Sequence, residues 1–239
     1  MMPFVITLTG ASQCGKSTAI NIFQELSKED RFPGFYPVSF QKYTTREFRS
    51  DEIERINIGE EVLNDQRPVI GKHNEVEGLF GEELFNARRW AFQQKKCDLA
   101  YEQYGDRYGL RLDDLYVHLK RGETPIVVLN DVRTVEDIKT KLGGQCFSLF
   151  IFREAPILNN FKIIGAKRHE PIEKTETRYK KAELIYRIYI ENIHVFDKLI
   201  LNSASTESIE CGSNDSLRRI IERLTMYLCE PIKEFKEAL

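Results

Sequence analysis

The sequence predicts an α/β fold: a mostly parallel five-stranded sheet with helices on both faces. Five short segments are rich in Val, Ile, Leu and Phe, and most of them are continuous apolar runs without polar alternation. Runs of this kind are typical of parallel strands that helices cover on both faces. The predicted strands are residues 4–9, 36–40, 125–129, 146–152 and 198–201.

Helix-length segments separate these strands, as a parallel sheet requires. The predicted helices are residues 18–27, 113–121 and 134–142, and a long helix from about 173 to 191. A last helix is predicted because Leu217, Ile221 and Leu224 share one helical face, with Asp215 or Ser216 as its N-cap. At 239 residues, we expect one folding unit.

Two segments interrupt the alternation. The first is polar, charged and aromatic, which predicts an inserted subdomain, and the second has a mixed composition that predicts a lid. The expected organisation is core for residues 1–40, 113–152 and 179–239, insertion for 41–112, and lid for 153–178. The open sheet is expected to bind its ligands at the carboxyl ends of the strands.

The balance of charges excludes broad classes of partner. There are 35 Lys and Arg residues against 37 Asp and Glu, so no global basic surface favours nucleic acid or an anionic membrane. The start, MMPFVITLTG, has no basic leader or cleavage site, and no apolar run reaches membrane-span length. We therefore expect a cytoplasmic protein. The five cysteines and four histidines are dispersed and predict no metal cage.

An octapeptide between the first predicted strand and the first predicted helix matches GxxxxGK[ST]. Its glycines let successive N–H groups point at phosphate oxygens, and the helix N-terminus adds a positive dipole end. Lys16 is expected to neutralise the β- and γ-phosphates, and the Ser17 hydroxyl to ligate magnesium. The predicted ATP-binding residues are Gly10, Ala11, Ser12, Gln13, Cys14, Gly15, Lys16, Ser17 and Thr18.

This motif predicts the P-loop NTPase fold with ATP and Mg²⁺ as cofactors, but GTPases, motor ATPases and small-molecule kinases share it. Two further segments carry residues suited to phosphate. In TTREFRSDE, Arg46 and Arg49 lie three apart behind two threonines and form a fork for bidentate capture of a phosphate. In YGDRYG, Tyr108 can hydrogen-bond a second phosphate oxygen.

On these residues the chain resembles the guanylate kinase family. TTREFRSDE is similar to that family's TTRxxRxxE motif, and YGDRYG to its GNxYG motif. Further similarities follow in the same order: an apolar strand that ends at Asp131, then Arg168, then Arg178 with Ala182, then FDKLILN at 196–202, similar to YDxxxxN. The resemblance covers most of the chain except about 53–97, where this chain is longer and an extra element is expected.

The resemblance implies an ATP-dependent phosphotransferase that transfers the γ-phosphoryl group to a phosphorylated small acceptor, a nucleoside or deoxynucleoside monophosphate. By resemblance, the catalytic residues are Lys16, Arg49, Arg168 and Arg178. The acceptor-binding residues are Arg46, Arg49, Tyr108 and Asp131, and the magnesium residues are Ser17 and Asp131. Asn202 either faces the donor base or caps the turn after its strand.

Four positions depart from the family's pattern of guanine readers, namely Lys42, Leu99, Leu110 and Leu129. A polar base edge against leucine loses its partners, at about 1–3 kcal/mol each. The sequence therefore disfavours GMP as the acceptor, unless a shift in register brings Asp98, Glu102 or Asn130 to these positions.

Three other functions remain open at this stage. The first is a kinase that acts on a sugar phosphate, as the related ribose bisphosphate phosphokinases do. A non-catalytic guanylate-kinase-like binding module would typically lack the intact Gly15, Lys16 and Ser17. A GTPase would need an NKxD-type guanine reader, which the residues after Asn202 do not supply. The expected partner is a small molecule, with the chain a monomer or homodimer.

Overall fold

The computed structural model describes residues 3–46, 86, 89–90, 92–93, 97–103, 105–153, 158–167, 171–203 and 215–229. The chain divides into two compact units, one formed by residues 1–39 with 122–239 and the other by residues 40–121. The predicted α/β fold with a five-stranded parallel sheet is confirmed, and this sheet lies in the first unit.

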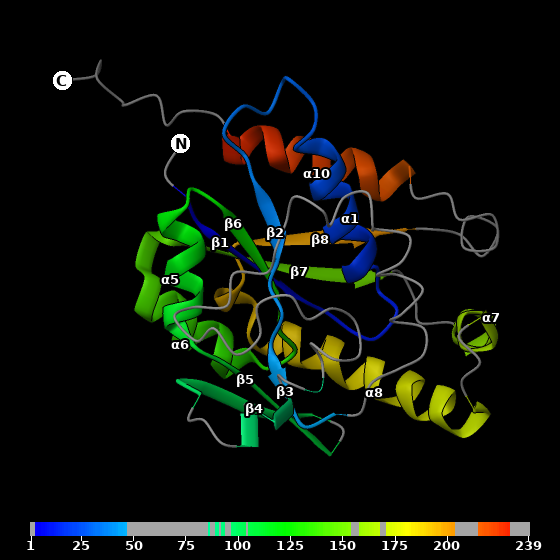
Figure 1. The fold of residues 1–239 in the computed structure, drawn as a ribbon. Helices are drawn as coiled ribbons and strands as arrows, with labels where there is room; N and C mark the ends of the chain where they lie inside the picture. Colours follow the sequence, from blue (N-terminus) through cyan, green and yellow to red (C-terminus); the bar gives the residue numbers. More distant parts are fainter. Residues whose placement is uncertain are drawn as a thin grey trace. The chain divides into compact units, whose positions relative to one another are not determined.

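The central sheet has the strand order β2-β6-β1-β7-β8, and every pair in it is parallel (Figure 1). Its strands are β1 Val5–Thr9, β2 Pro37–Ser39, β6 Thr124–Val128, β7 Cys146–Arg153 and β8 Lys198–Asn202. All five predicted strands are found, with ends within one or two residues of the prediction. β1 is buried along its whole length, which explains why its sequence shows no polar alternation.

Helices cover both faces of this sheet (Figure 1). One face packs against α1 Lys16–Leu26 and α10 Asp215–Cys229, whose apolar stripes join the core formed by the strands. On the other face, the rings of Phe150 and Phe152 in β7 meet Tyr186 in α8 Ile172–Glu191. The remaining elements of this unit are α6 Val132–Leu142, η2 Gly143–Gln145, α7 Leu158–Lys167 and η3 Ile193–Val195.

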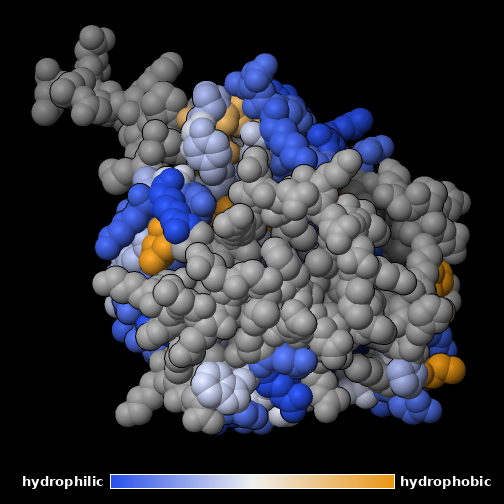
Figure 2. Space-filling model, viewed as in Figure 1, coloured by the Kyte–Doolittle hydropathy of each residue, from blue (hydrophilic) through white to orange (hydrophobic). Residues whose placement is uncertain are grey.

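Ion pairs hold α10 against α1 at the surface. Arg218 pairs with Glu25 and, at 3.3 Å, with Glu29. Arg31 pairs with Glu29 at 2.6 Å and with Glu222 at 2.5 Å. Hydrophilic side chains gather over this part of the molecule (Figure 2). Because these pairs are partly exposed, each adds little stability, and the apolar contacts beneath them fix the helix.

The second unit contains a three-stranded antiparallel sheet of order β3-β5-β4. Its described elements are β3 Tyr43–Thr44, β4 Leu99–Gln103, β5 Asp106–Leu110 and α5 Leu112–Lys120. The sequence did not predict these strands, because they are short and alternate polar with apolar residues. Among the helices of the described residues, none combines the length and apolar composition needed to cross a membrane.

A polar clamp fixes the start of β8 against β7. The Asp197 carboxylate accepts hydrogen bonds from the Ser148 N–H at 2.7 Å, the Ser148 hydroxyl at 2.8 Å and the Lys139 ammonium at 2.9 Å. Burial alone would raise the pKa of Asp197, but the bonds from Lys139 and Ser148 outweigh burial and lower it. The clamp sets the register in which Arg153 pairs with Asn202 at the far end of the two strands.

We predict that Asp197→Asn lowers the free energy of unfolding by about 1–3 kcal/mol at neutral pH, because it removes a charged acceptor from three donors. The pKa of Asp197 lies below its ordinary 3.8 in the folded state, so its stabilisation is present above that pH and is lost as the pH falls through the folded value. Urea unfolding of both proteins across this range should show their difference shrinking in acid. Asp137→Asn on the exposed side of α6 is the control, and a difference that stays constant in acid would contradict the prediction.

Candidate functional site

The loop between β1 and α1 makes two sharp reversals that its glycines allow. Gly10 has φ 151° and Gly15 has φ 107°, values that favour glycine. A Cβ atom on Gly10 would overlap the Ile151 carbonyl oxygen, and one on Gly15 would lie 2.7 Å from the Asn202 amide nitrogen. Gln13 has φ 64° and is the one residue other than glycine with positive φ in the described part of the chain. Residues 10–17 are called the phosphate loop below.

Four carbonyl oxygens of the phosphate loop accept hydrogen bonds from side chains. The Lys16 ammonium curls back and donates to Gly10 O at 2.7 Å and Ala11 O at 2.6 Å. The Arg153 guanidinium donates through Nη1 to Gln13 O at 3.0 Å, and the Asn202 amide donates to Cys14 O at 2.9 Å. The side chains of Lys16, Arg153 and Asn202 therefore fix the direction of four peptide units of the loop.

This arrangement sets the direction of the loop's N–H groups. In a trans peptide, the C=O and the following N–H point in opposite directions, and no described peptide bond is cis. Because Arg153 and Asn202 hold the carbonyls of Gln13 and Cys14, the N–H groups of Cys14 and Gly15 turn away from those two side chains. The Cys14 N–H donates within the loop, to Ala11 O at 3.4 Å. The Gly15 N–H and the N-terminus of α1 can donate to an anion.

The loop lies at the carboxyl edge of the parallel sheet. Arg153 and Asn202 are register partners at the ends of β7 and β8, and β7 lies next to β1. On the other side of β1, β6 leads to Asp131 at the N-cap of α6. The Asp131 carboxylate accepts from Thr134 N at 2.8 Å and Thr134 Oγ1 at 2.7 Å, so its orientation is fixed. Ligands of open α/β sheets bind at this edge.

Several polar atoms at the loop are buried and have no hydrogen-bond partner in the described structure. They are Nε and Nη2 of Arg153 and both polar atoms of the Gln13 side-chain amide. Arg153 is 6% exposed, and burial lowers the pKa of its guanidinium, an effect that the nearby Tyr186 and Cys14 partly offset. Buried polar atoms are nearly always paired, so these atoms are suited to bind a ligand at the phosphate loop.

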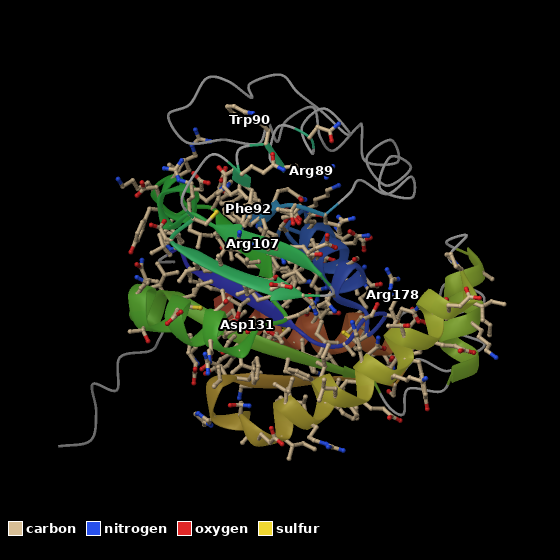
Figure 3. The ribbon with its side chains drawn as sticks, turned by 90° about the horizontal axis from the view of Figure 1, so that it is seen from below. Arg89, Trp90, Phe92, Arg107, Asp131 and Arg178 are labelled. Carbon is tan, nitrogen blue, oxygen red and sulfur yellow. The ribbon has the colours of Figure 1, made fainter. Side chains whose placement is uncertain are left out.

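Helix α8 carries the predicted Arg178, which is 8% exposed and is labelled in Figure 3 together with Asp131. Arg178, Ala182 and Tyr186 recur every four residues, so they share one face of the helix, and all three are buried. The Tyr186 hydroxyl accepts from the Arg153 N–H at 3.3 Å, and burial raises the pKa of Tyr186 to about 12. The predicted Arg49 and Arg168 lie outside the described residues.

In the second unit, the predicted Arg46 follows β3, and the predicted Tyr108 lies on β5 opposite Thr44. The Tyr108 ring stacks on Tyr101 with centroids 5.3 Å apart. The Lys42 ammonium bonds the Tyr101 hydroxyl at 2.5 Å and lies 4.8 Å from the Tyr108 ring centroid. A cation and two phenols therefore meet on one face of this sheet.

Apolar residues pack on this sheet as well. Leu99 and Leu110 are register partners, are buried, and share the face of Tyr101 and Tyr108, because side chains alternate along a strand. The Arg107 guanidinium lies 5.4 Å from the centroid of the Phe92 ring, and both residues are labelled in Figure 3. Gly109 has no room for a Cβ, because Cys97 and Phe92 press against it.

The sequence reasoning missed two parts of these sites. Arg153 was assigned to the predicted lid, because an arginine followed by Glu154 has the appearance of a solvated charge. The sequence feature that indicates a role for Arg153 is its position directly after a predicted apolar strand, because ligands bind at the carboxyl ends of such strands. The contact between Lys42 and Tyr101 joins residues 59 positions apart, and no pattern in the sequence indicates it.

Comparisons with known proteins add the following. A scan against protein-family models finds no match, and a search of curated proteins finds none. Among solved structures, the chain is similar to guanylate kinase from Anaplasma phagocytophilum, with a TM-score of 0.47 and 16% identity over 97% of this chain and 91% of that one. It is also similar to a gluconokinase from Sinorhizobium meliloti 1021, with a TM-score of 0.32 and 10% identity over 95% and 98%. The candidate site at the phosphate loop is therefore defined by its geometry alone.

We predict that Gly15→Ala weakens binding of ATP roughly 10-fold or more, because the new Cβ displaces the Asn202 amide from the loop and adds backbone strain. Gly34→Ala is the matched control, since Gly34 also has positive φ, 79°, but has nothing within 4 Å of its Cβ position. Titration calorimetry with ATP measures the effect. Equal affinities of the two variants would contradict a steric role for Gly15.

Proposed function

We propose that this chain is an ATP-dependent phosphotransferase of guanylate-kinase-like type. It transfers the γ-phosphoryl group of ATP to a phosphorylated small acceptor, a nucleoside or deoxynucleoside monophosphate. One observation carries the proposal: the carbonyls of the phosphate loop are held by Lys16, Arg153 and Asn202, so the direction of its peptide units is fixed beside the N-terminus of α1.

The donor site fits a polyphosphate. Lys16 is held over the loop by Gly10 O, Ala11 O and Cys14 Sγ, and its ammonium would exchange these contacts for phosphate oxygens when a nucleotide binds. The unpaired nitrogens of Arg153 add positive charge beside the loop. Phosphoryl transfer needs charge neutralisation and alignment more than covalent chemistry, and these are the groups that supply both.

The residues available for magnesium also fit. In the described part of the chain, no group of three or more His, Cys, Asp or Glu side chains could hold a metal ion. Mg²⁺ is usually bound by one or two protein oxygens together with phosphates and water, so a dense cage is not required. Ser17 at the first turn of α1 and Asp131 after β6 would hold it, and there it would neutralise phosphate charge.

The second unit supplies the acceptor-binding residues of the proposal. Arg46, which follows β3, and Tyr108, on the neighbouring strand β5, would bind the acceptor's phosphate. Lys42 is a hydrogen-bond donor with no acceptor capacity, so in this unit it would favour an acceptor that presents carbonyl or phosphate oxygens over one that presents donors. Arg178 on α8, with its buried guanidinium, would stabilise the transferring phosphoryl group.

The experiment that tests this function measures release of ADP from Mg-ATP in a coupled assay, across nucleoside and deoxynucleoside monophosphates and ribose phosphates. The proposal expects one nucleotide class to stimulate ADP release well above the rate without acceptor. Stimulation by a ribose phosphate alone would favour the sugar-phosphate kinase instead. Binding of ATP without stimulation by any acceptor would reject the transferase and leave a binding module.

We predict that Lys16→Ala lowers kcat/KM for ATP roughly 100-fold or more, because two or more charge-assisted bonds to phosphate are lost. Lys28→Ala, at an exposed position after α1, is the control and should leave the kinetics unchanged. Steady-state assays with saturating acceptor measure the effect. A normal kcat/KM in the Lys16 variant would refute the assignment of the loop.

We predict that Arg46→Ala raises KM for the acceptor roughly 10- to 100-fold and leaves the affinity for ATP unchanged, because only the acceptor's phosphate loses its partner. Arg121→Ala, which alters an exposed arginine in the same unit, is the control. Acceptor titrations at fixed ATP, with calorimetry for ATP, measure both quantities. An equal loss of ATP affinity would show that Arg46 acts on the donor or on the fold.

A further inference from the structure

We propose that Arg153 is a positioning residue of the phosphate loop, and that the polyphosphate of the nucleotide is the counter-ion of its buried charge. This inference rests on the proposed binding of ATP and assigns a role to a residue that no motif of the chain includes. Arg153 is the last residue of β7, its guanidinium donates to Gln13 O at 3.0 Å, and its Nε and Nη2 are buried without a partner.

Among the residues that the structure describes, no acidic side chain compensates the charge of Arg153. Arg153 is 6% exposed, and no carboxylate of the described residues forms an ion pair with it. A buried ion without a partner is costly and usually persists because a ligand supplies the opposite charge. The described groups that act on Arg153 include the Tyr186 phenol, the Cys14 side chain and the main chain of the loop, and no carboxylate is among them.

The position of Arg153 relates this charge to the anion site. Its hydrogen bond to Gln13 O lies on the opposite side of the peptide unit from the Cys14 N–H. The Cys14 N–H donates to Ala11 O at 3.4 Å, so this peptide unit is held from both sides. The guanidinium adds positive potential beside the loop.

A purely structural brace would have different consequences. If Arg153 only held the loop in shape, its removal would destabilise the ligand-free protein and weaken every nucleotide equally. If a bound polyphosphate is the counter-ion of Arg153, replacing Arg153 by a neutral side chain removes a buried charge that has no counter-ion in the ligand-free protein. The ligand-free variant should then be as stable as wild type or more stable, while its affinity for polyphosphate falls. The loss should also grow with the charge of the ligand.

The test compares wild type, Arg153→Met, Arg153→Lys and the control Arg223→Met, which alters an exposed arginine of α10. Thermal unfolding measures the stability of each ligand-free protein, and calorimetry measures Kd for ATP, ADP, AMP and inorganic tripolyphosphate. For Arg153→Met we expect an unchanged or higher Tm and a Kd for ATP and tripolyphosphate raised roughly 10- to 100-fold. The affinity for ADP should fall less than the affinity for ATP, and the affinity for AMP should fall least. Arg153→Lys, which keeps the charge without the planar fork, should restore part of the loss.

Three results would overturn the proposal. One is a lower Tm of Arg153→Met with equal losses for ATP, ADP and AMP, which would indicate a brace. Another is an unchanged Kd for ATP and tripolyphosphate in Arg153→Met, and if that variant does not fold, an unchanged Kd in Arg153→Lys. The third is a wild-type protein that binds no polyphosphate. Failure of the proposed function is distinguishable, because wild-type protein that binds ATP but transfers no phosphoryl group leaves the Arg153 inference intact.

Discussion

The direction of the peptide units in residues 10–17 is the constraint on which the site depends. A loop of this length can fold in many ways, and only one orientation of its amides concentrates positive potential at a single point. Here, Arg153 and Asn202 take the carbonyls of Gln13 and Cys14, and Lys16 takes those of Gly10 and Ala11. Side chains at the ends of β7 and β8 thus help to fix the direction of these peptide units, and the glycines allow the backbone to adopt it.

The topology of the sheet explains why these side chains are available. The chain runs from β1 to β2 on one side, then crosses from β6 over β1 to β7 and β8 on the other. β1 therefore lies where the order of the strands reverses, and this is the place where open α/β sheets bind ligands. The phosphate loop follows β1, Asp131 follows β6, and Arg153 and Asn202 end β7 and β8. The phosphate loop, Asp131, Arg153 and Asn202 therefore all lie at one edge of the sheet.

The fold was predictable from the sequence because its parallel strands are buried on both faces and are consequently apolar throughout. The phosphate loop was predictable because its chemistry requires glycine, lysine and a hydroxyl at fixed spacing. Arg153 was not, because its side chain contacts Gln13, 140 residues away in the sequence, and such a long-range contact leaves no local trace. The antiparallel sheet of the second unit was missed because strands such as β3, two residues long, carry too little pattern.

The clamp at Asp197 has a consequence for the opposite end of β8. A β-strand is nearly inextensible, and the five residues from Lys198 to Asn202 span about 16 Å at roughly 3.3 Å each. A small shift at the first residue of such a strand is therefore carried almost undiminished to the last one, where the Asn202 amide touches the loop. Lys139 and Ser148 are remote from the phosphate loop, yet through Asp197 and β8 they help to fix the position of the Asn202 amide at that loop.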